Sequence, residues 1–378
     1  MSQNCRFIDN GNNQFSSSDL TTRLDTLVKN PDGSYRLTRK DQSFYVFNPA
    51  GQLTQQGNGH GQYLTMAYDA EGRLVSVVEP VSGSAHTFQY NLDGLISGVT
   101  DDLNRQVAFE YDANRNLTKI TDAKGQSITY TYNAQGRVLT ATDAEGVQIF
   151  SNTYDGQGRV ATQDDAITTN QLARFNYDET IEPGKVITTV YDRNGQSRVL
   201  THDSNYQLLS LKDELGNIIN TYTYDGDGNR TSVTDANGNT TTFSYDTRGN
   251  LLSTTDPAGN ISRMTYDSRN NLLTVENAVY KKITYTYDAN NNITSVTNPL
   301  GNIKTLTYDG NGLLLTETTP RGGTTTYAYV YGRVYSITNA SGNTTTFGYD
   351  AVGRLVSKTD AAGKITTMAY DNADNLLT

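Results

Sequence analysis

The sequence predicts an all-β protein: an array of antiparallel β-hairpins that coils into a spiral or a partial, cocoon-like shell. Three observations predict it. An aromatic residue returns about every 21 residues, short segments rich in Thr, Leu, Ile and Val lie between the returns, and turn signals containing Gly bracket each segment. A fixed period of this length is typical of repeat architectures. Segments of about six residues between such turns indicate strands rather than helices.

The repeating signal is a Tyr-Asp pair or a close relative of it, found in sixteen registers at steps of 20 to 25 residues. Phe47 extends the series towards the N-terminus, and His202 fills the gap between two tyrosines. A series of this regularity predicts one structural unit for each step. The tyrosines of the series are Tyr68, Tyr90, Tyr111, Tyr132, Tyr154, Tyr177, Tyr224, Tyr245, Tyr266, Tyr287, Tyr308, Tyr329, Tyr349 and Tyr370.

Each unit carries two turn signals, ten to eleven residues apart. In the unit that begins at Tyr245, both signals read Asp-x-x-Gly, at residues 246–249 and 256–259. The Asp side chain can accept the backbone N–H two residues on, and Gly takes the positive φ that closes a short hairpin. At Asn270 and Asn291 the Gly is replaced by Asn, which also tolerates positive φ. Each unit is therefore predicted to be one hairpin of a continuous meander.

Two columns of residues mark the better-buried face. An aliphatic residue such as Leu251 lies six positions after the Tyr, and a large apolar residue such as Phe243 lies two before it. Residues i and i−2 of a strand face the same way, so the units are predicted to stack their aromatic residues into ladders that hold the register. The residues assigned a structural role are the Tyr series with Gly72, Gly136, Gly249 and Leu251.

The array is predicted to span residues 31–378 as about sixteen units, with residues 1–30 as an N-terminal cap or connecting segment. Glu182-Pro183-Gly184 interrupts a strand position and predicts a protruding loop or a bulged corner. A sheet of about thirty-two strands cannot stay flat and must coil. Each unit has few large apolar residues, so much of one face is expected to meet water and to leave the structure hollow or grooved.

Composition excludes several classes of function. A net charge of −10 argues against binding a nucleic-acid backbone. Cys5 is the only cysteine, which excludes an intramolecular disulfide, and no apolar run is long enough to span a membrane. Residues 1–13 lack the apolar stretch of a secretory signal. A chain of this kind is expected to be exported or associated with a cell surface by another route.

The units Tyr68-Asp-Ala-Glu-Gly-Arg-Leu and Tyr349-Asp-Ala-Val-Gly-Arg-Leu resemble those of the Rhs/YD-repeat family, and the resemblance covers roughly residues 32–378. It implies a shell like those of bacterial polymorphic toxins, insecticidal toxin complexes and teneurins. In the bacterial toxins, delivered by secretion systems, such a shell encloses a C-terminal effector. The family's self-cleaving aspartyl site is not assigned to Asp256-Pro257-Ala258-Gly259, because that segment lies on the ordinary turn period.

The leading hypothesis is a structural shell segment whose partners are a C-terminal toxin cargo or further shell repeats. The alternative is an extracellular adhesin that binds a cell-surface glycan or protein through exposed Tyr. A self-cleaving peptidase is a third hypothesis, but His60, His86 and His202 show no metal or catalytic spacing. Turn capping explains the Asp columns better than calcium does. No catalytic residue, metal or cofactor is expected.

Overall fold

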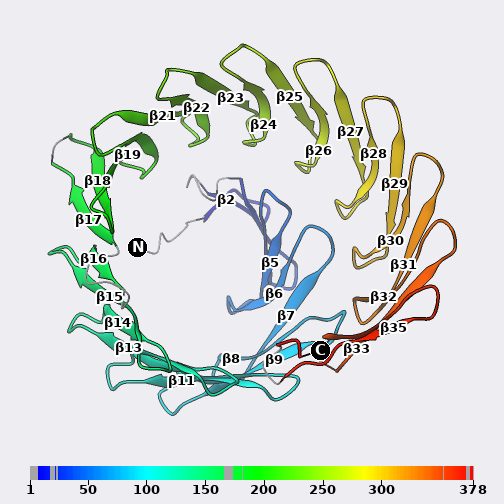
Figure 1. Cartoon of the computed structure of the whole chain (residues 1–378), viewed down its shortest axis with the longest axis horizontal. Helices are drawn as coiled ribbons and strands as arrows, with labels where there is room; N and C mark the ends of the chain where they lie inside the picture. Colours follow the sequence, from blue (N-terminus) through cyan, green and yellow to red (C-terminus); the bar gives the residue numbers. More distant parts are fainter. Residues whose placement is uncertain are drawn as a thin grey trace.

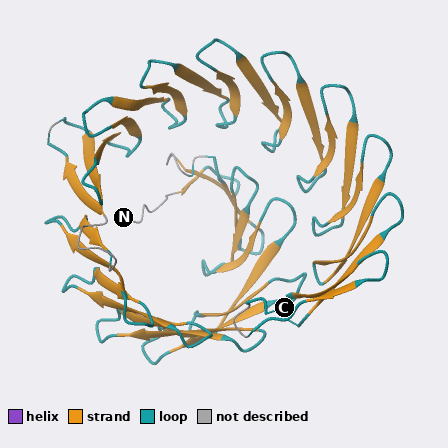
Figure 2. Cartoon of the chain, viewed as in Figure 1, coloured by secondary structure: helices purple, strands orange, loops and turns teal. Residues whose placement is uncertain are grey.

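The computed structural model describes residues 7–17, 22, 24–165, 173–180, 182–351, 353–371 and 375–377. These residues form 35 strands of one sheet. The parts of the chain covered by these ranges contain no helix (Figure 2). The predicted all-β class is therefore confirmed.

The strands are short and follow one another along the whole chain. They are β1 (Phe7–Asp9), β2 (Gln14–Ser17), β3 (Thr26–Lys29), β4 (Tyr35–Thr38), β5 (Phe44–Phe47), β6 (Leu53–Gly57), β7 (Tyr63–Tyr68), β8 (Leu74–Val78), β9 (Ala85–Tyr90), β10 (Ile96–Asp101), β11 (Gln106–Tyr111), β12 (Leu117–Thr121), β13 (Ser127–Tyr132), β14 (Val138–Thr142), β15 (Gln148–Tyr154), β16 (Val160–Asp164), β17 (Ala173–Asp178), β18 (Lys185–Asp192), β19 (Ser197–Asp203), β20 (Leu208–Lys212), β21 (Ile218–Tyr224), β22 (Arg230–Asp235), β23 (Thr240–Tyr245), β24 (Leu251–Thr255), β25 (Ile261–Tyr266), β26 (Leu272–Glu276), β27 (Lys282–Tyr287), β28 (Ile293–Thr297), β29 (Ile303–Tyr308), β30 (Leu314–Thr318), β31 (Thr324–Val330), β32 (Arg333–Thr338), β33 (Thr344–Tyr349), β34 (Leu355–Thr359) and β35 (Ile365–Thr367).

The sheet is a meander in which each strand from β2 to β34 pairs antiparallel with the strand before it and the strand after it. In the unit of residues 245–265, for example, Thr254 of β24 lies opposite Phe243 of β23 on one side and Ser262 of β25 on the other. Antiparallel neighbours need only a short turn between them. The pairing is therefore local in sequence throughout, as the repeat predicts.

Both turns of a unit have the predicted geometry. In the second turn, the N–H of Asp256 donates to the carbonyl of Asn260 at 3.0 Å, and the N–H of Gly259 donates to the carbonyl of Asp256 at 2.9 Å. Oδ1 of Asp256 accepts the backbone N–H groups of Ala258, at 2.9 Å, and Asn260, at 2.8 Å. A turn closed in this way connects two strands without leaving its own N–H groups unpaired.

The fourth turn position has a positive φ, as predicted. φ is 68° at Gly249 and 84° at Gly259, and it is 68° at Asn270 and 62° at Asn291. Gly has no Cβ and adopts this conformation freely, whereas L-residues other than Asn rarely do, because their Cβ meets the following carbonyl. The prediction that Asn270 and Asn291 adopt a positive φ in place of Gly is confirmed.

A β-bulge lies opposite the tyrosine in most units. In the pair β27–β28, Thr286 lies opposite Ser295 but Tyr287 lies opposite Ile293, so Thr294 is an extra residue. The same shift occurs beside Tyr132 and Tyr245. A bulge bends its strand and increases the local twist. Because it recurs in most units and in the same place, the sheet bends repeatedly in one sense and coils.

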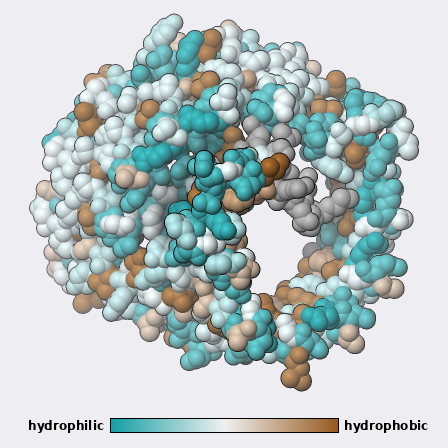
Figure 3. Space-filling view, turned by 180° about the vertical axis from the view of Figure 1, so that it is seen from behind, coloured by the Kyte–Doolittle hydropathy of each residue, from teal (hydrophilic) through white to brown (hydrophobic). Residues whose placement is uncertain are grey.

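The coil makes more than one turn. The strands from β8 onwards follow a ring, and the earlier strands β2–β7 lie inside it (Figure 1). In the space-filling view an opening passes through the middle of the molecule (Figure 3). The predicted spiral and the predicted hollow are thus both present.

Burial in this sheet is shallow. Phe44 and Ala141 are the buried hydrophobic residues, at 9% and 1% exposure, among those the structure describes. Met264 and Tyr266 of β25 are half-buried while Arg263 and Thr265 are exposed, so the Tyr and the residue two before it do share a face. The expected ring-to-ring ladder is wrong as a general feature: in the described chain, ring pairs occur at Phe15–Tyr35 and Phe175–Tyr177.

The interruption near Pro183 is a loop rather than a bulge. It connects β17 to β18, and the N–H of Lys185 donates to the carbonyl of Glu182. Neither pairing of β18 has a register shift, so the bulged-corner alternative is wrong. The division at residue 30 stays a prediction; β1–β3 lie before it and pair within the same sheet.

We expect Gly259→Ala to lower the free energy of unfolding by about 1–2 kcal/mol, because a Cβ is strained at a φ of 84°. No atom lies within 4 Å of the position that this Cβ would take, so backbone strain is the whole effect. Gly259→Asn should lower the free energy of unfolding by less, because Asn tolerates a positive φ better than Ala. Thermal unfolding followed by circular dichroism measures both, and equal losses would contradict the explanation.

Candidate functional site

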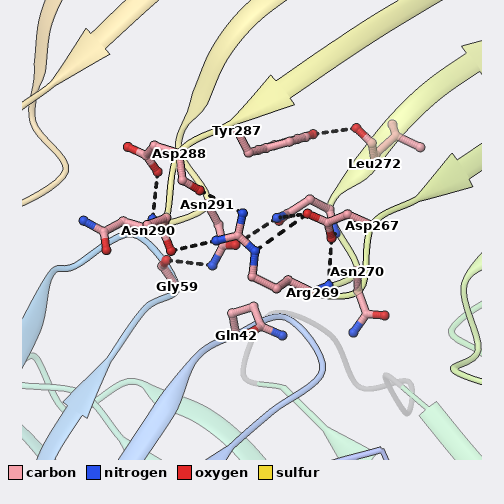
Figure 4. A network of polar contacts seen from close by, with 12 residues as sticks. Gln42, Gly59, Asp267, Arg269, Asn270, Leu272, Tyr287, Asp288, Asn290 and Asn291 are labelled. Carbon is pink, nitrogen blue, oxygen red and sulfur yellow. Dashed lines mark hydrogen bonds and ion pairs between the residues drawn. The ribbon is translucent and has the colours of Figure 1, made fainter.

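Most units are tied to the one before by the hydroxyl group of their tyrosine. The hydroxyl of Tyr287, the last residue of β27, donates to the carbonyl of Leu272, the first residue of β26, at 2.8 Å (Figure 4). The acceptor belongs to the aliphatic column of the preceding unit. The equivalent bond is made by Tyr68, Tyr90, Tyr111, Tyr132, Tyr154, Tyr177, Tyr224, Tyr245, Tyr329, Tyr349 and Tyr370.

The bulge explains why a tyrosine is needed. After the bulge, Leu272 is paired with Tyr266 on one side, and on the other side the ladder to β27 begins two residues further on, at Thr274. The Leu272 carbonyl therefore lacks a backbone partner from β27, and an unpaired buried carbonyl is costly. The hydroxyl of Tyr287 supplies the bond. Burial raises the pKa of Tyr287, so the hydroxyl keeps its proton.

The residue after the turn glycine joins the turn to the next tyrosine. Nε of Arg73 donates to Oδ2 of Asp69 at 2.7 Å, and the Arg73 guanidinium lies 4.9 Å from the ring centre of Tyr90. Arg159 and Arg354 repeat the pattern with their own Asp and the next Tyr. A guanidinium over a ring is attracted by its π face. One side chain therefore closes its own turn and packs on the following unit.

Asn takes over the turn-closing role in other units. Nδ2 of Asn271 donates to Oδ2 of Asp267 at 2.9 Å, and Asn250 and Asn292 do the same to their own Asp. Asn250 and Asn292 are 4% and 5% exposed. The sequence analysis missed this position. The signal was an Arg or an Asn five residues after most of the column tyrosines.

The turns also join successive coils of the spiral, along a line that we call the seam. It lies where turns of the first coil contact the turns that follow the column tyrosines in the second coil. The first-coil turns are residues 39–43, 58–62 and 79–84, and the second-coil turns are 246–250, 267–271, 288–292, 309–313 and 330–333.

Among the described residues, side-chain hydrogen bonds cross the seam from Lys40, Asn270 and Asn291. Nζ of Lys40 donates to the carbonyl of Gly249 at 2.6 Å. Nδ2 of Asn270 donates to the carbonyl of Lys40, and Nδ2 of Asn291 to that of Gly59, both at 3.2 Å (Figure 4 shows the second). These bonds join residues 209 to 232 positions apart, so one turn of the coil takes about ten to eleven units.

The coils also approach closely at glycines. A Cβ at Gly312 would lie 2.1 Å from the carbonyl oxygen of His60, and one at Gly332 would lie 3.1 Å from Cγ1 of Val81. Beside these contacts is a cavity of about 480 Å³ lined by residues that include Tyr45, Tyr63 and Leu313. The two coils are therefore close together along the seam. Each amide bond across it contributes about 1 kcal/mol and the Lys40 bond about 2 kcal/mol.

The comparisons with known proteins agree with this geometry. The profile of the RHS Repeat family matches residues 47–83, 90–127, 116–148, 224–261, 245–280, 266–303, 308–344, 330–364 and 349–378, which together are more than half of the chain. The chain belongs to the RHS repeat family. No curated protein matches its sequence.

Solved structures resemble the fold of this RHS repeat chain. Crystal structures of TcdB2-TccC3-Cdc42 and of TcdB2-TccC3 without its hypervariable C-terminal region each superpose with a TM-score of 0.60 over 93% of this chain, at 14% and 15% identity. A Tc holotoxin pore from Photorhabdus luminescens superposes over 93% with a TM-score of 0.51 and 15% identity. The chain covers 23% of each of the first two chains and 24% of the third.

The RHS repeat explains where the predicted site residues lie. The predicted tyrosines end their strands, with three exceptions: Asp178 follows Tyr177 within β17, Val330 follows Tyr329 within β31, and Tyr370 forms an isolated bridge with Leu376. Gly72 and Gly136 have φ of 80° and 73°, and Leu251 begins β24 opposite Tyr245. Their assignment as functional residues stays a prediction.

Two other predicted positions belong to the same column. His202 lies opposite Leu208 and Phe47 lies opposite Leu53, each beside the bulge where a Tyr stands in other units. Both are therefore substitutes in the Tyr column, as predicted. In the described ranges, no three His, Cys, Asp or Glu side chains are grouped closely enough to hold a metal ion. The same ranges include no helix long and apolar enough to cross a membrane.

Replacing one column tyrosine should weaken the RHS repeat locally. Tyr287→Phe removes the donor to the Leu272 carbonyl and is expected to cost about 1 kcal/mol of unfolding free energy. Tyr280→Phe is the matched control, since Tyr280 is 80% exposed at a turn. Urea unfolding followed by circular dichroism compares the two. A cost no larger than that of the control would refute the role of the hydroxyl.

Stability should fall at both ends of the pH range. The hydrogen bond from the Asn116 amide holds the pKa of Asp112 below its usual 3.8, and Asp256 behaves likewise with Asn260, so this stability is present above pH 3.8 and is lost as the pH falls further. Burial raises the pKa of Tyr132 and Tyr287 above 10.0, so their contribution is complete below pH 10.0 and is lost above it. A midpoint of urea unfolding that is level from pH 5 to 9 and declines outside is expected; steady change across that window would contradict it.

Proposed function

We propose that this chain is a wall segment of an RHS-type toxin shell, and that the shell encloses or presents a C-terminal toxin domain lying outside this chain. The observation that carries the proposal is the coil itself. A continuous sheet winds round an open interior and meets itself at the seam (Figures 1 and 3). Such a wall separates an inside from an outside with one polypeptide.

The comparisons support the toxin setting. The solved chains with the same fold include one described as part of a Tc holotoxin pore. Their low identity makes this an argument from fold, and fold alone does not determine function. This chain spans about a quarter of their length, so cargo, export and assembly belong to the proposal.

The proposed mechanism is steric. Within the wall, most strands have both edges paired, which removes the exposed edges that promote unwanted sheet growth. A cargo inside would be kept from proteases and from its target until delivery. We propose no catalytic role for the wall, because the side chains that recur in each unit are used in turns and in bonds between units.

The bonding of the column tyrosines favours a shell over an adhesin. A glycan-binding surface needs aromatic faces and free polar groups that are open to solvent. Most column hydroxyls are instead bonded to carbonyls inside the sheet, as Tyr132 is to Leu117. Among the exposed tyrosines, Tyr206, Tyr280 and Tyr331 lie in turns between strands, and Tyr335 lies within β32.

Protease protection tests the shell. The full-length polypeptide expressed from the native gene is digested with trypsin, and the segment that follows this chain is detected by mass spectrometry. We expect that segment to survive in the native state and to be cleaved at least tenfold faster after denaturation in urea and return to buffer by rapid dilution. Equal cleavage rates would refute enclosure. Glycan-array binding lost in a Tyr280→Ala variant would support the adhesin instead.

A further inference from the structure

We propose that the seam is a releasable closure: Asn270 and Asn291 determine where the first coil docks on the second, and the coils can part there while the sheet stays paired. This goes beyond the shell proposal, because it concerns contacts within this chain and holds whatever the cargo is. If the chain does form a toxin shell, the seam is the part of the wall that can open.

The first step is that the seam and the sheet share no bonds. All described strand pairings join chain neighbours, so none of them connects the two coils. The side-chain hydrogen bonds described across the seam run from Lys40, Asn270 and Asn291 to carbonyls in turns, and the Arg333 guanidinium attracts the Glu79 carboxylate across it. Separating the coils therefore breaks no ladder hydrogen bond, and water can hydrate the freed amides and carbonyls.

The second step is the coincidence of Asn with the seam. The fourth position of a turn requires a positive φ, and Gly meets this requirement in most units, as at Gly136 and Gly249. Asn270 and Asn291 meet it too, and each carries an amide that Gly lacks. Both amides reach a carbonyl of the first coil. The substitution therefore supplies a seam donor without changing the turn.

The third step is that these amides are held in place before docking. Oδ1 of Asn270 accepts Nδ2 of Asn250 at 2.9 Å, and Oδ1 of Asn291 accepts Nδ2 of Asn271 at 2.8 Å. Each Oδ1 is thus fixed by the neighbouring turn, which directs Nδ2 towards the first coil. Arg269 strengthens the row by donating to the carbonyls of Asp288 and Ala289 (Figure 4). A donor with a fixed direction selects one docking position over its neighbours.

The seam bonds join second-coil turns to turns 209 to 232 residues earlier, and Asn270 and Asn291 are one 21-residue unit apart. A slip by one unit would place Asn291 opposite the turn of Lys40 and leave Asn270 without its acceptor. The pair of Asn residues therefore specifies the register of the coils as well as holding them.

A cysteine pair across the seam makes docking measurable. An ideal Cβ at Gly332 lies 3.7 Å from Cβ of Val81, within the range that a disulfide requires. The parent protein for all comparisons is the full chain with Cys5→Ser, Val81→Cys and Gly332→Cys. Every variant is made in this parent, so the backbone strain at residue 332 is the same in all of them. The readouts are the rate of disulfide formation and the far-ultraviolet circular dichroism of the sheet.

The test variant adds Asn270→Gly and Asn291→Gly to this parent. Both turns keep a residue suited to positive φ, but the seam donors are lost. We expect disulfide formation to slow at least fivefold with an unchanged circular dichroism spectrum. Arg115→Gly is the matched control, because Arg115 has a φ of 68° at the same turn position but makes no described contact across the seam. An unchanged rate, or a slowing accompanied by loss of the β-sheet spectrum, would overturn the proposal.

Release is tested with the parent in low concentrations of urea. In the reduced form, small-angle X-ray scattering should show the radius of gyration rising before the circular dichroism changes. In the oxidised form this early expansion should be absent. Expansion that coincides with loss of the sheet in the reduced form would show that the coils do not part independently, and the proposal would fail.

Discussion

The hydrogen bond from most column tyrosines to a carbonyl of the preceding unit is the interaction on which the rest of the structure depends. The bulge that bends the sheet leaves that carbonyl without a ladder partner, and the tyrosine hydroxyl supplies one, as Tyr154 does for Val138 at 2.6 Å. Without the bulge the array would not coil, and without the hydroxyl the bulge would leave a carbonyl unpaired at every step. Curvature and its stabilisation therefore arise from one position in the repeat.

Dependence on hydrogen bonds between units suits a chain with a small hydrophobic core. Few side chains are fully buried among the described residues, so hydrophobic burial alone cannot hold the units in register. Directed bonds do so instead: the Asp carboxylate closes its own turn, Arg or Asn closes it from the other side, and Arg73 also packs on the ring of Tyr90. Each unit contacts its neighbours by the same few groups, so stability increases by nearly equal increments along the array.

The sequence predicted what is local. Asp-x-x-Gly specifies its turn within five residues, so both turns of residues 245–265 and the Asn substitutions were predicted correctly. The bulge was not, because Thr294, the extra residue, is no different from its neighbours in the strand. The aromatic ladder was predicted from periodicity, which places rings on one face but does not say whether they bond to rings or to carbonyls.

The seam could not be predicted from the sequence for a further reason. Which turns meet depends on the number of units in one turn of the coil, and that number is the sum of many small bends. A change of a few degrees in each unit would move the partner of Lys40 from one turn to the next. A residue that bonds across the seam must therefore fit its own turn and also suit a contact that the curvature of the whole coil determines. Asn270 does so: its backbone serves the turn that any unit needs, and its amide serves a contact that arises only after the coil has closed. A repeat array can acquire such a contact by single substitutions without changing the unit, which is why the closure is weaker than the sheet it joins.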